Sequence, residues 1–360
     1  MNIDTTINNL PILTWNWLKI NNVPFSYSAA VNAADSTVAG TLPEGVSYKA
    51  DAGSDTGAYA GIATGVGKNT DSVFSEAKVR TALITAKKNV HVSAPVLISF
   101  DQADRSSTAS AQIIRAEEGS SVTVIISYTS PESASGFQAV RTLCSAGKNA
   151  YIHLVKVQLL GSSFTQIDDT GTFCEEGGRV EVTQIILGGK ETYAGVAAAL
   201  PSYRSSFKSD TAYLCMGEQK LDMNYIVRHT GRKTDCKMSV KGTLSGNAVK
   251  TYRGSIDFKS GCAGATGNEQ EETLLLSPTV VNKSIPLILC DEEDVAGEHG
   301  ATIGRLGEDT LFYMQSRGIS KQSAEQIMAR AKVAGTAALI PDETVVTKIN
   351  NYLDKAFAHE

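Results

Sequence analysis

The sequence predicts a mainly β protein with a small helical region at its C-terminal end. Short β-type runs follow one another from HVSAPVLISF (residues 91–100) to PLILC (residues 286–290), separated by Gly, Asn, Asp and Ser. In several runs apolar and polar residues alternate, as Val155 and Val157 do with Lys156, which is the pattern of a half-buried strand. Helical periodicity returns only after Gly307.

Three architectures are open to such a train of strands: a sandwich, a barrel or a solenoid of stacked coils. Two-residue Asn-Gly and Asp-Gly turns, which join the strands of tight hairpins, are absent between the runs. Their absence favours the solenoid. No repeat with fixed residues is visible, so the three architectures stay open at this point.

The two ends of the chain differ from its middle. Residues 1–75 are rich in Ala, Gly, Ser, Asp and Asn, which predicts a largely irregular region, and the segment Ser75–Lys88 has the composition of a short helix. Near the other end, Glu308 and Asp309 open one short helix, and Ser320 can cap a second. Pro341 begins a third helix, since proline suits the first turn.

Composition and charge exclude several classes of function. The chain has 360 residues with 33 basic and 38 acidic side chains, a net charge of −5, so no positive excess is available for nucleic acid. No apolar run approaches the ~20 residues that cross a bilayer, and no signal sequence is visible, so we expect a cytoplasmic protein without membrane contact. The six cysteines are scattered singly, which argues against a disulfide framework or a zinc ribbon and predicts that most are buried.

A nucleotide site is not predicted. The segment GIATGVGKNT resembles a phosphate-binding loop, but Ile62 replaces its first glycine. Asn69 stands where the magnesium-binding hydroxyl belongs, and no apolar strand leads into the segment.

Among the histidines, His299 has the most potential metal-ligand side chains near it in the sequence. Cys290, Glu298 and several further acids surround it, and Cys262 and Glu271 precede it by one strand run. In a solenoid, residues twenty to thirty apart can become neighbours, so Cys262 and Glu271 could converge with Cys290 or His299 on a metal ion. The alternative is a solvated acidic loop beside a buried strand end.

The other four histidines are expected to have no such role. His91 and His153 lie inside strand runs and suggest structural positions. His229 sits at a turn among basic residues and is expected in solvent, while His359 is next to the C-terminus and is expected to fray.

Ordered motifs in the last third of the chain resemble one known family. They are HGAT (299–302), GED (307–309), LFY (311–313) and SRGIS (316–320), preceded by TDCKMSVKGTLSGNAVKTYRGSIDF (234–258) and TLLLSP (273–278). Together they resemble the SufB/SufD family of the SUF iron–sulfur cluster assembly system. The likeness is strong over residues 225–330 and weak over the first 75, where LPILTWNWLKIN matches loosely.

The resemblance implies a fold and a set of partners. It implies a right-handed parallel β-helix, or β-solenoid, over residues 76–306, between an irregular or helical N-terminal region (1–75) and a C-terminal helical region (307–360). In that family the helical region docks the SufC ATPase, which supplies the nucleotide chemistry, and the β-helix pairs with SufB. The implied function is that of a scaffold without its own catalysis, which helps iron to enter and a cluster to form at the interface of the paired β-helices.

Two alternatives to this function stand beside it. The first is a homodimer of this chain that works with SufC alone. The second, from another class, is a polysaccharide lyase or hydrolase, because parallel β-helices also serve those enzymes.

The resemblance also implies candidate ligands. His299 followed by Gly300 is the SufD form, whereas SufB carries a glutamate after this histidine. The thiol positions of the family are occupied here by Gly297 and Glu271, so only the histidine carries over directly. The candidate metal ligands are therefore three residues close in sequence: His299, Glu298 and Cys290. Transient iron or an iron–sulfur cluster is the implied cargo, and no nucleotide is expected on this chain.

Overall fold

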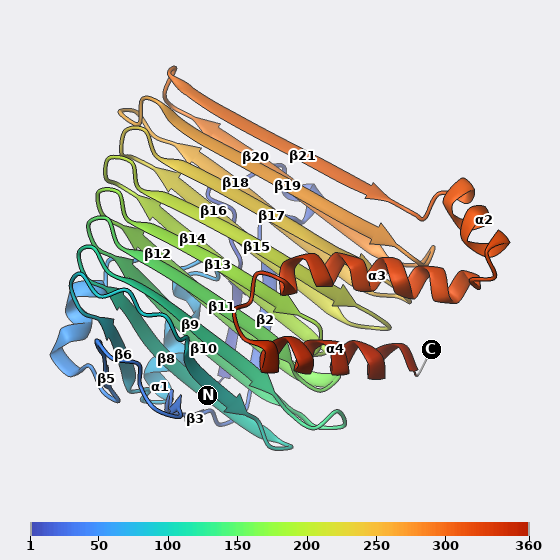
Figure 1. Ribbon diagram of the computed structural model, residues 1–360, viewed down its shortest axis with the longest axis horizontal. Helices are drawn as coiled ribbons and strands as arrows, with labels where there is room; N and C mark the ends of the chain where they lie inside the picture. The colour runs from blue at the N-terminus through green and yellow to red at the C-terminus, as the bar shows by residue number, and fades with distance from the viewer. Residues whose placement is uncertain (1, 359–360) are drawn as a thin grey trace.

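The structure, a computed structural model, describes residues 2–358, and its central body is a parallel β-solenoid (Figure 1). The chain alternates between two sheets, so each strand pairs with the strand two places further on. We call them the even sheet and the odd sheet. The even sheet is built from β6 (Thr81–Ala86), β8 (Ser106–Ala116), β10 (Ser135–Ala146), β12 (Ser163–Cys174), β14 (Glu191–Leu200), β16 (Lys220–His229), β18 (Val249–Phe258) and β20 (Val281–Cys290). The odd sheet is built from β7 (Val96–Asp101), β9 (Ser121–Thr129), β11 (Tyr151–Leu159), β13 (Arg179–Ile186), β15 (Ser206–Cys215), β17 (Asp235–Leu244), β19 (Ala265–Leu275) and β21 (Val295–Gly304).

One coil of the solenoid contains two strands, one from each sheet. Tyr151 of β11 pairs with Ser121 of β9 on one side and with Arg179 of β13 on the other, all in parallel register. Side chains one coil apart are therefore neighbours, and the His153 ring hydrogen-bonds Thr183 Oγ1 on the next coil. Parallel strands need crossovers rather than hairpins, which explains the missing hairpin turns. The mainly β class and the parallel solenoid are confirmed.

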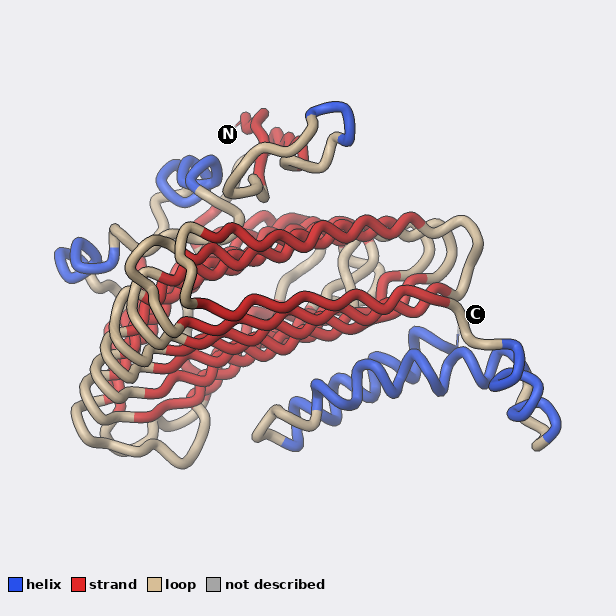
Figure 2. The backbone as a smooth tube through the Cα atoms, turned by 90° about the horizontal axis from the view of Figure 1, so that it is seen from above, coloured by secondary structure: helices blue, strands red, loops and turns tan. Residues whose placement is uncertain are grey.

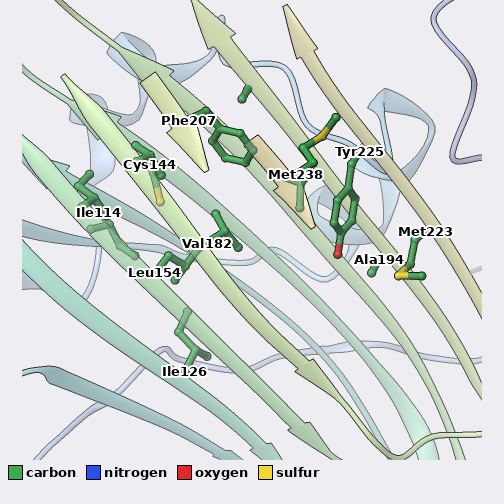
Figure 3. Packing of buried hydrophobic residues seen from close by; sticks show 14 of the residues in the cluster. Ile114, Ile126, Cys144, Leu154, Val182, Ala194, Phe207, Met223, Tyr225 and Met238 are labelled. Atoms are coloured by element: carbon green, nitrogen blue, oxygen red, sulfur yellow. The ribbon is translucent and has the colours of Figure 1, made fainter. Parts of the chain in front are cut away.

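Alternation along each strand divides its side chains between the lumen of the solenoid and its outer surface. Leu154 and Val182 point inward from the odd sheet, and Cys144 and Ala194 from the even sheet, where they pack in one continuous core (Figure 3). Most strands bury both faces, as β11 does. The chain therefore needs elements that cover the outside of each sheet.

The C-terminal helices cover the outer face of the odd sheet (Figure 2). They are α3 (Lys321–Ala337) and α4 (Glu343–Ala358), and their apolar sides pack on residues such as Val155, Val157 and Ile185. The Ser320 hydroxyl caps α3 by accepting from the Ser323 N–H at 3.0 Å, as the sequence predicted. The preceding helix α2 (Glu308–Ser316) buries none of its residues.

The N-terminal region covers the outer face of the even sheet. Strands β1 (Asn2–Ile7) and β2 (Val23–Ser28) form an antiparallel hairpin, and Phe25 and Tyr27 pack on Phe137 of β10. The other elements of this region are η1 (Asn16–Leu18), β3 (Asn32–Ala33), β4 (Val38–Ala39), β5 (Val46–Lys49), η2 (Gly53–Tyr59), η3 (Lys68–Thr70) and α1 (Asp71–Glu76). The region is thus more regular than its composition suggested, because the apolar surface of the even sheet organises it.

The short helix expected at Ser75–Lys88 is wrong. Helix α1 ends at Glu76, Lys78 adopts a left-handed φ of 54°, and strand β6 follows. β6 lies between β5 and β8, and Ala82 and Ile84 are buried there. Pairing on both edges outweighs the weak helical preference of so short a segment.

The two ends of the solenoid differ. At the first coil, the short strands β4 and β5 pair antiparallel with β7 and β6 and end each ladder. At the last coil, β20 and β21 are the final strands of their sheets, and no further described strand pairs with them. Nearly every residue of β21 is exposed. We call this end of the solenoid, formed by β20 and β21, the open end. No helix within residues 2–358 is long and apolar enough to span a membrane.

A buried ion pair interrupts the apolar lumen. Lys156 of β11 contacts the Asp168 carboxylate of β12, and both side chains are almost completely buried. The ammonium also donates to Thr170 Oγ1 at 2.6 Å, and Asp168 accepts from Gln184 Nε2 at 2.9 Å. Each charge therefore has further polar partners, which a buried pair requires.

Replacing only one partner of this pair should destabilise the fold strongly. Lys156→Met leaves the Asp168 carboxylate buried and unpaired, and we expect the free energy of unfolding to fall by about 3–5 kcal/mol. The double variant Lys156→Met with Asp168→Leu should lose much less free energy of unfolding, because it leaves no unpaired buried charge. Urea denaturation measures both, with Lys148→Met in an exposed pair as the control. Equal losses for the single and double variants would contradict the buried pair.

Candidate functional site

His299 lies on β21, the last strand of the odd sheet. Its register partner on β19 is Glu269, which points into the lumen and is buried. Because directly paired residues of parallel strands share a face, the histidine stands on the lumen side of the open end, one coil beyond the glutamate. The imidazole itself is exposed, since no later coil covers it.

The other two candidate ligands occupy different places. Glu298 is next to His299 in sequence and therefore faces outward, where Asn268 Nδ2 donates to its carboxylate at 3.0 Å. Cys290 is exposed at the end of β20, and its thiol donates to the backbone oxygen of Glu292 at 3.0 Å. Within residues 2–358 no three His, Cys, Asp or Glu side chains are gathered so that they could hold a metal ion. The chain alone does not bring His299, Glu298 and Cys290 together, and their role as ligands stays a prediction.

Glu271, which stands at a thiol position of the family, is already engaged in the lumen. Its carboxylate pairs with the buried Lys250 ammonium and accepts from the hydroxyls of Ser284 and Thr273. Desolvation lowers the pKa of Lys250, although the Glu271 charge opposes the shift. The expected convergence of Glu271 with a thiol is not seen, because Lys250 neutralises this carboxylate.

Cys262 is buried just before β19 and has no cysteine partner in a disulfide. Burial raises the pKa of its thiol, and the nearby Glu292 carboxylate raises it further. The protonated thiol is a poor metal ligand, because the thiolate is the binding form.

Glu269 is the titratable group of the open end that the sequence did not single out. Burial raises the pKa of its carboxyl to about 7, with Glu271 adding to the shift and Tyr252 and Lys250 opposing it. One of its oxygens, Oε2, has no hydrogen-bond partner among the residues that the structure describes. A Cβ at residue 254 would overlap this carboxylate, so Gly254 provides the space that it occupies. The 30-residue interval between Glu269 and His299, one coil, is the signal that would have found it.

The remaining histidines and cysteines are mostly structural. The expectation that His229 is solvated is wrong: it is fully buried on the lumen side of β16, with Nδ1 2.7 Å from Thr234 Oγ1 and its ring on Phe258. Burial lowers its pKa to about 4. His153 is buried and bonded to Thr183, as expected, and His359 lies outside the described residues.

Five of the six cysteines are buried, which confirms the prediction made for most of them. Burial raises the pKa of Cys144 and of Cys215 to about 12, so both thiols are protonated at neutral pH.

On the lumen side of the open end, the His299 imidazole lies one coil beyond the Glu269 carboxyl group. Both are ligand types that iron accepts, and two groups leave most coordination positions free. Fold and site together define a parallel β-solenoid protein with one closed end and one open end that presents histidine and carboxylate side chains.

Comparison with known proteins identifies the family within this class. Residues 99–332 match the family model described as the SufBD core domain of SUF system FeS cluster assembly. This match covers most of the chain, from β7 to α3. The chain therefore belongs to the SufBD family of iron–sulfur cluster assembly proteins.

Curated relatives agree with this assignment at low identity. The chain is 24% identical over 279 residues to the iron–sulfur cluster assembly protein SufD of Bacillus subtilis, covering 76% of this chain and 63% of that protein. It is 22% identical over 226 residues to SufD of Escherichia coli, covering 63% and 53%. A chloroplastic SufBD family protein of Arabidopsis thaliana is 25% identical over 240 residues, covering 64% and 43%. The aligned region thus spans between 43% and 63% of these relatives.

The raised pKa of Glu269 predicts a pH-dependent stability. Below its ordinary value of 4.5 the carboxyl is protonated in both states and costs nothing; above about 7 the folded state must bury the charge. The folded protein should therefore lose about 3 kcal/mol relative to Glu269→Gln as pH rises through this window. Denaturation of both proteins at pH 5 and pH 8 measures the change.

Glu272→Gln is the matched control for that experiment. Lys332 and Lys241 lower the pKa of Glu272, so this carboxylate is ionised in both states throughout the window. The stability difference between this variant and the natural chain should stay flat from pH 5 to pH 8. A flat difference for Glu269→Gln as well would contradict the raised pKa.

Proposed function

We propose that this chain is a SufD-like scaffold subunit for iron–sulfur cluster assembly. The family match over residues 99–332 is the observation that supports it most directly. In this proposal the chain works with SufB and the SufC ATPase in the cytoplasm, binds no nucleotide and catalyses no reaction by itself. The match favours cluster assembly over the polysaccharide lyase or hydrolase alternative.

The open end is the proposed pairing surface. The outer edges of β20 and β21 carry backbone N–H and C=O groups that no described strand pairs. Such edges bind another strand readily, because each added strand completes a ladder of hydrogen bonds. SufB is the proposed partner of a heterodimer. The homodimer that works with SufC alone uses the same edges.

His299 is the proposed ligand for iron or a nascent cluster. It stands at the pairing surface on the lumen side, with Glu269 one coil behind it. The partner subunit would supply further ligands, since the chain alone gathers too few. Glu298 and Cys290 remain further candidates because both are exposed at the same end.

The helical region 307–360 is the proposed docking surface for SufC, and the packing of its helices supports a more specific proposal within it. The inner sides of α3 and α4 are committed to the odd sheet. Helix α2 is free of such packing and exposes Phe312 and Tyr313, which are 74% and 59% exposed. Exposed aromatic side chains are frequent anchors of protein interfaces. We therefore place the centre of the SufC contact on α2.

His299→Ala should reduce the iron or cluster retained by the assembled complex by on the order of tenfold, because a ligand is lost. Cluster loading is measured by absorbance and iron content after reconstitution with SufB and SufC. His91→Ala, an exposed histidine near the first coils, is the control. Unchanged loading would remove the ligand role of His299 and leave the scaffold role in place.

Phe312→Ser should weaken SufC binding by about tenfold, as expected for loss of a central aromatic contact. Calorimetric titration of the chain with SufC measures the affinity. Tyr203→Ser changes an exposed aromatic residue on a solenoid turn and should bind SufC as the natural chain does. Equal affinities for all three chains would contradict the placement on α2.

A further inference from the structure

The loop of the N-terminal hairpin exposes an unusual amount of apolar surface. We call residues 9–20, between β1 and β2, the tryptophan tip. Five of its large apolar side chains are exposed: Ile12 52%, Leu13 76%, Trp15 73%, Trp17 74% and Leu18 37%. Contiguous apolar surface of this kind usually marks an interaction site.

The tip is held in one conformation. The Asn21 side chain accepts from the backbone N–H of Thr14 at 2.8 Å and from its hydroxyl at 2.7 Å, and returns a bond to the Thr14 carbonyl. The Leu10 N–H donates to the Asn21 carbonyl at 2.8 Å. The rings of Trp15 and Trp17 stack with centroids 6.3 Å apart. Little ordering entropy would therefore be lost when the tip binds.

The hairpin carries the tip toward the open end. At its base, Tyr27 bonds Ser107 of β8, at 2.7 Å. Near the tip, Arg253 of β18 donates to the Ile20 carbonyl at 2.6 Å and pairs with Asp222 of β16 at 2.6 Å. The hairpin thus crosses the outer face of the even sheet and reaches the strand next to β20, as its faded strands behind the sheets show in Figure 1.

The last strand continues this apolar surface. Ile285 of β20 is the register partner of Arg253 and shares its outward face, where it is already buried within the chain. Two residues and four residues further on, Leu287 and Leu289 face the same way and are only partly covered. An apolar row therefore runs along the free edge beside the tip.

We infer that the tryptophan tip packs on the outer face of β20 in a second copy of this chain when two open ends pair. This rests on the homodimer form of the edge pairing in the proposed function. A second copy fits because one chain supplies both halves of the contact, the tip and the β20 row, as a two-fold interface requires. The tip carries Lys19 as its one basic residue, so little attracts it to an anionic membrane.

The chain's two tryptophans both lie in the tip, so a tryptophan probe reports on this site alone. The full chain labelled with 5-fluorotryptophan should give two ¹⁹F resonances whose shift between H₂O and D₂O shrinks as the chain dimerises. Sedimentation equilibrium on the same samples measures the dimer. Trp15→Ser with Trp17→Ser should raise the dimer dissociation constant by about tenfold or more.

A second variant addresses the other half of the contact. Leu287→Asp places a charge in the apolar row of β20, which consists of Ile285, Leu287 and Leu289, and changes no residue of the tip. It should weaken the dimer to a similar extent. Tyr203→Ser, which removes an exposed aromatic residue away from both, should leave the dimer unchanged. Circular dichroism melts confirm that each variant is folded.

Three results would overturn the inference. A dimer in which both tryptophans keep their full solvent shift would remove the tip from the interface while leaving edge pairing intact. A chain that stays monomeric at every concentration would exclude a second copy as the occupant, without affecting the His299 and SufC assays. Loss of the solvent shift on vesicles of phosphatidylcholine and phosphatidylglycerol, but not on self-association, would assign the tip to a lipid surface.

Discussion

The structure depends on one constraint: each strand pairs in parallel with the strand one coil later. This ladder sets the register that stacks side chains one coil apart, and it builds the continuous lumen core. The ladder of paired strands ends at the last coil. The final coil has no later coil to satisfy its backbone groups, so β20 and β21 end as free edges. The candidate site and the proposed pairing surface both lie at this last coil, where the backbone groups of β20 and β21 are not paired by a further described strand.

The rest of the chain solves the second problem of a solenoid, which is its apolar outer surface. The N-terminal region covers the even sheet and the two C-terminal helices cover the odd sheet. Polar contacts hold these covers in place, such as Lys332 of α3 with Glu272 of β19 at 2.5 Å. The covers lie on the outer faces and leave the lumen side of the last coil open, so His299 is exposed there while Glu269, one coil inward, is enclosed.

The sequence was informative where local patterns decide the structure. Alternating runs such as the one around Val155, together with the lack of hairpin turns, favoured a β-solenoid, and the cap at Ser320 began α3 as expected. It was misleading where burial decides. His229 lies beside basic residues at a turn and was expected in solvent, but it is the last residue of β16, and the alternation of the strand points it into the lumen. Ile84 lies in the segment that was expected to be helical, but it belongs to strand β6 because β5 and β8 pair with the two edges of that strand.

In the candidate site, too, some residues were predicted from local sequence motifs and others were found only from the fold. His299 was found from its motif, whereas Glu269 became visible only when the coil register was known. Glu298 and His299 are adjacent in sequence, but the strand places them on opposite faces. Lys250 neutralises Glu271, a pairing between two strands of different sheets that no local pattern indicates. Sequence proximity is thus a poor guide to which ligands can meet in this fold.

The closed first coil has a consequence for assembly. Within residues 2–358, the short antiparallel strands β4 and β5 end the two ladders on the side of the first coil. A solenoid with two bare ends could add copies without limit and grow into a fibre. If strands pair only at the open end, as proposed above, association through strand edges stops at a pair.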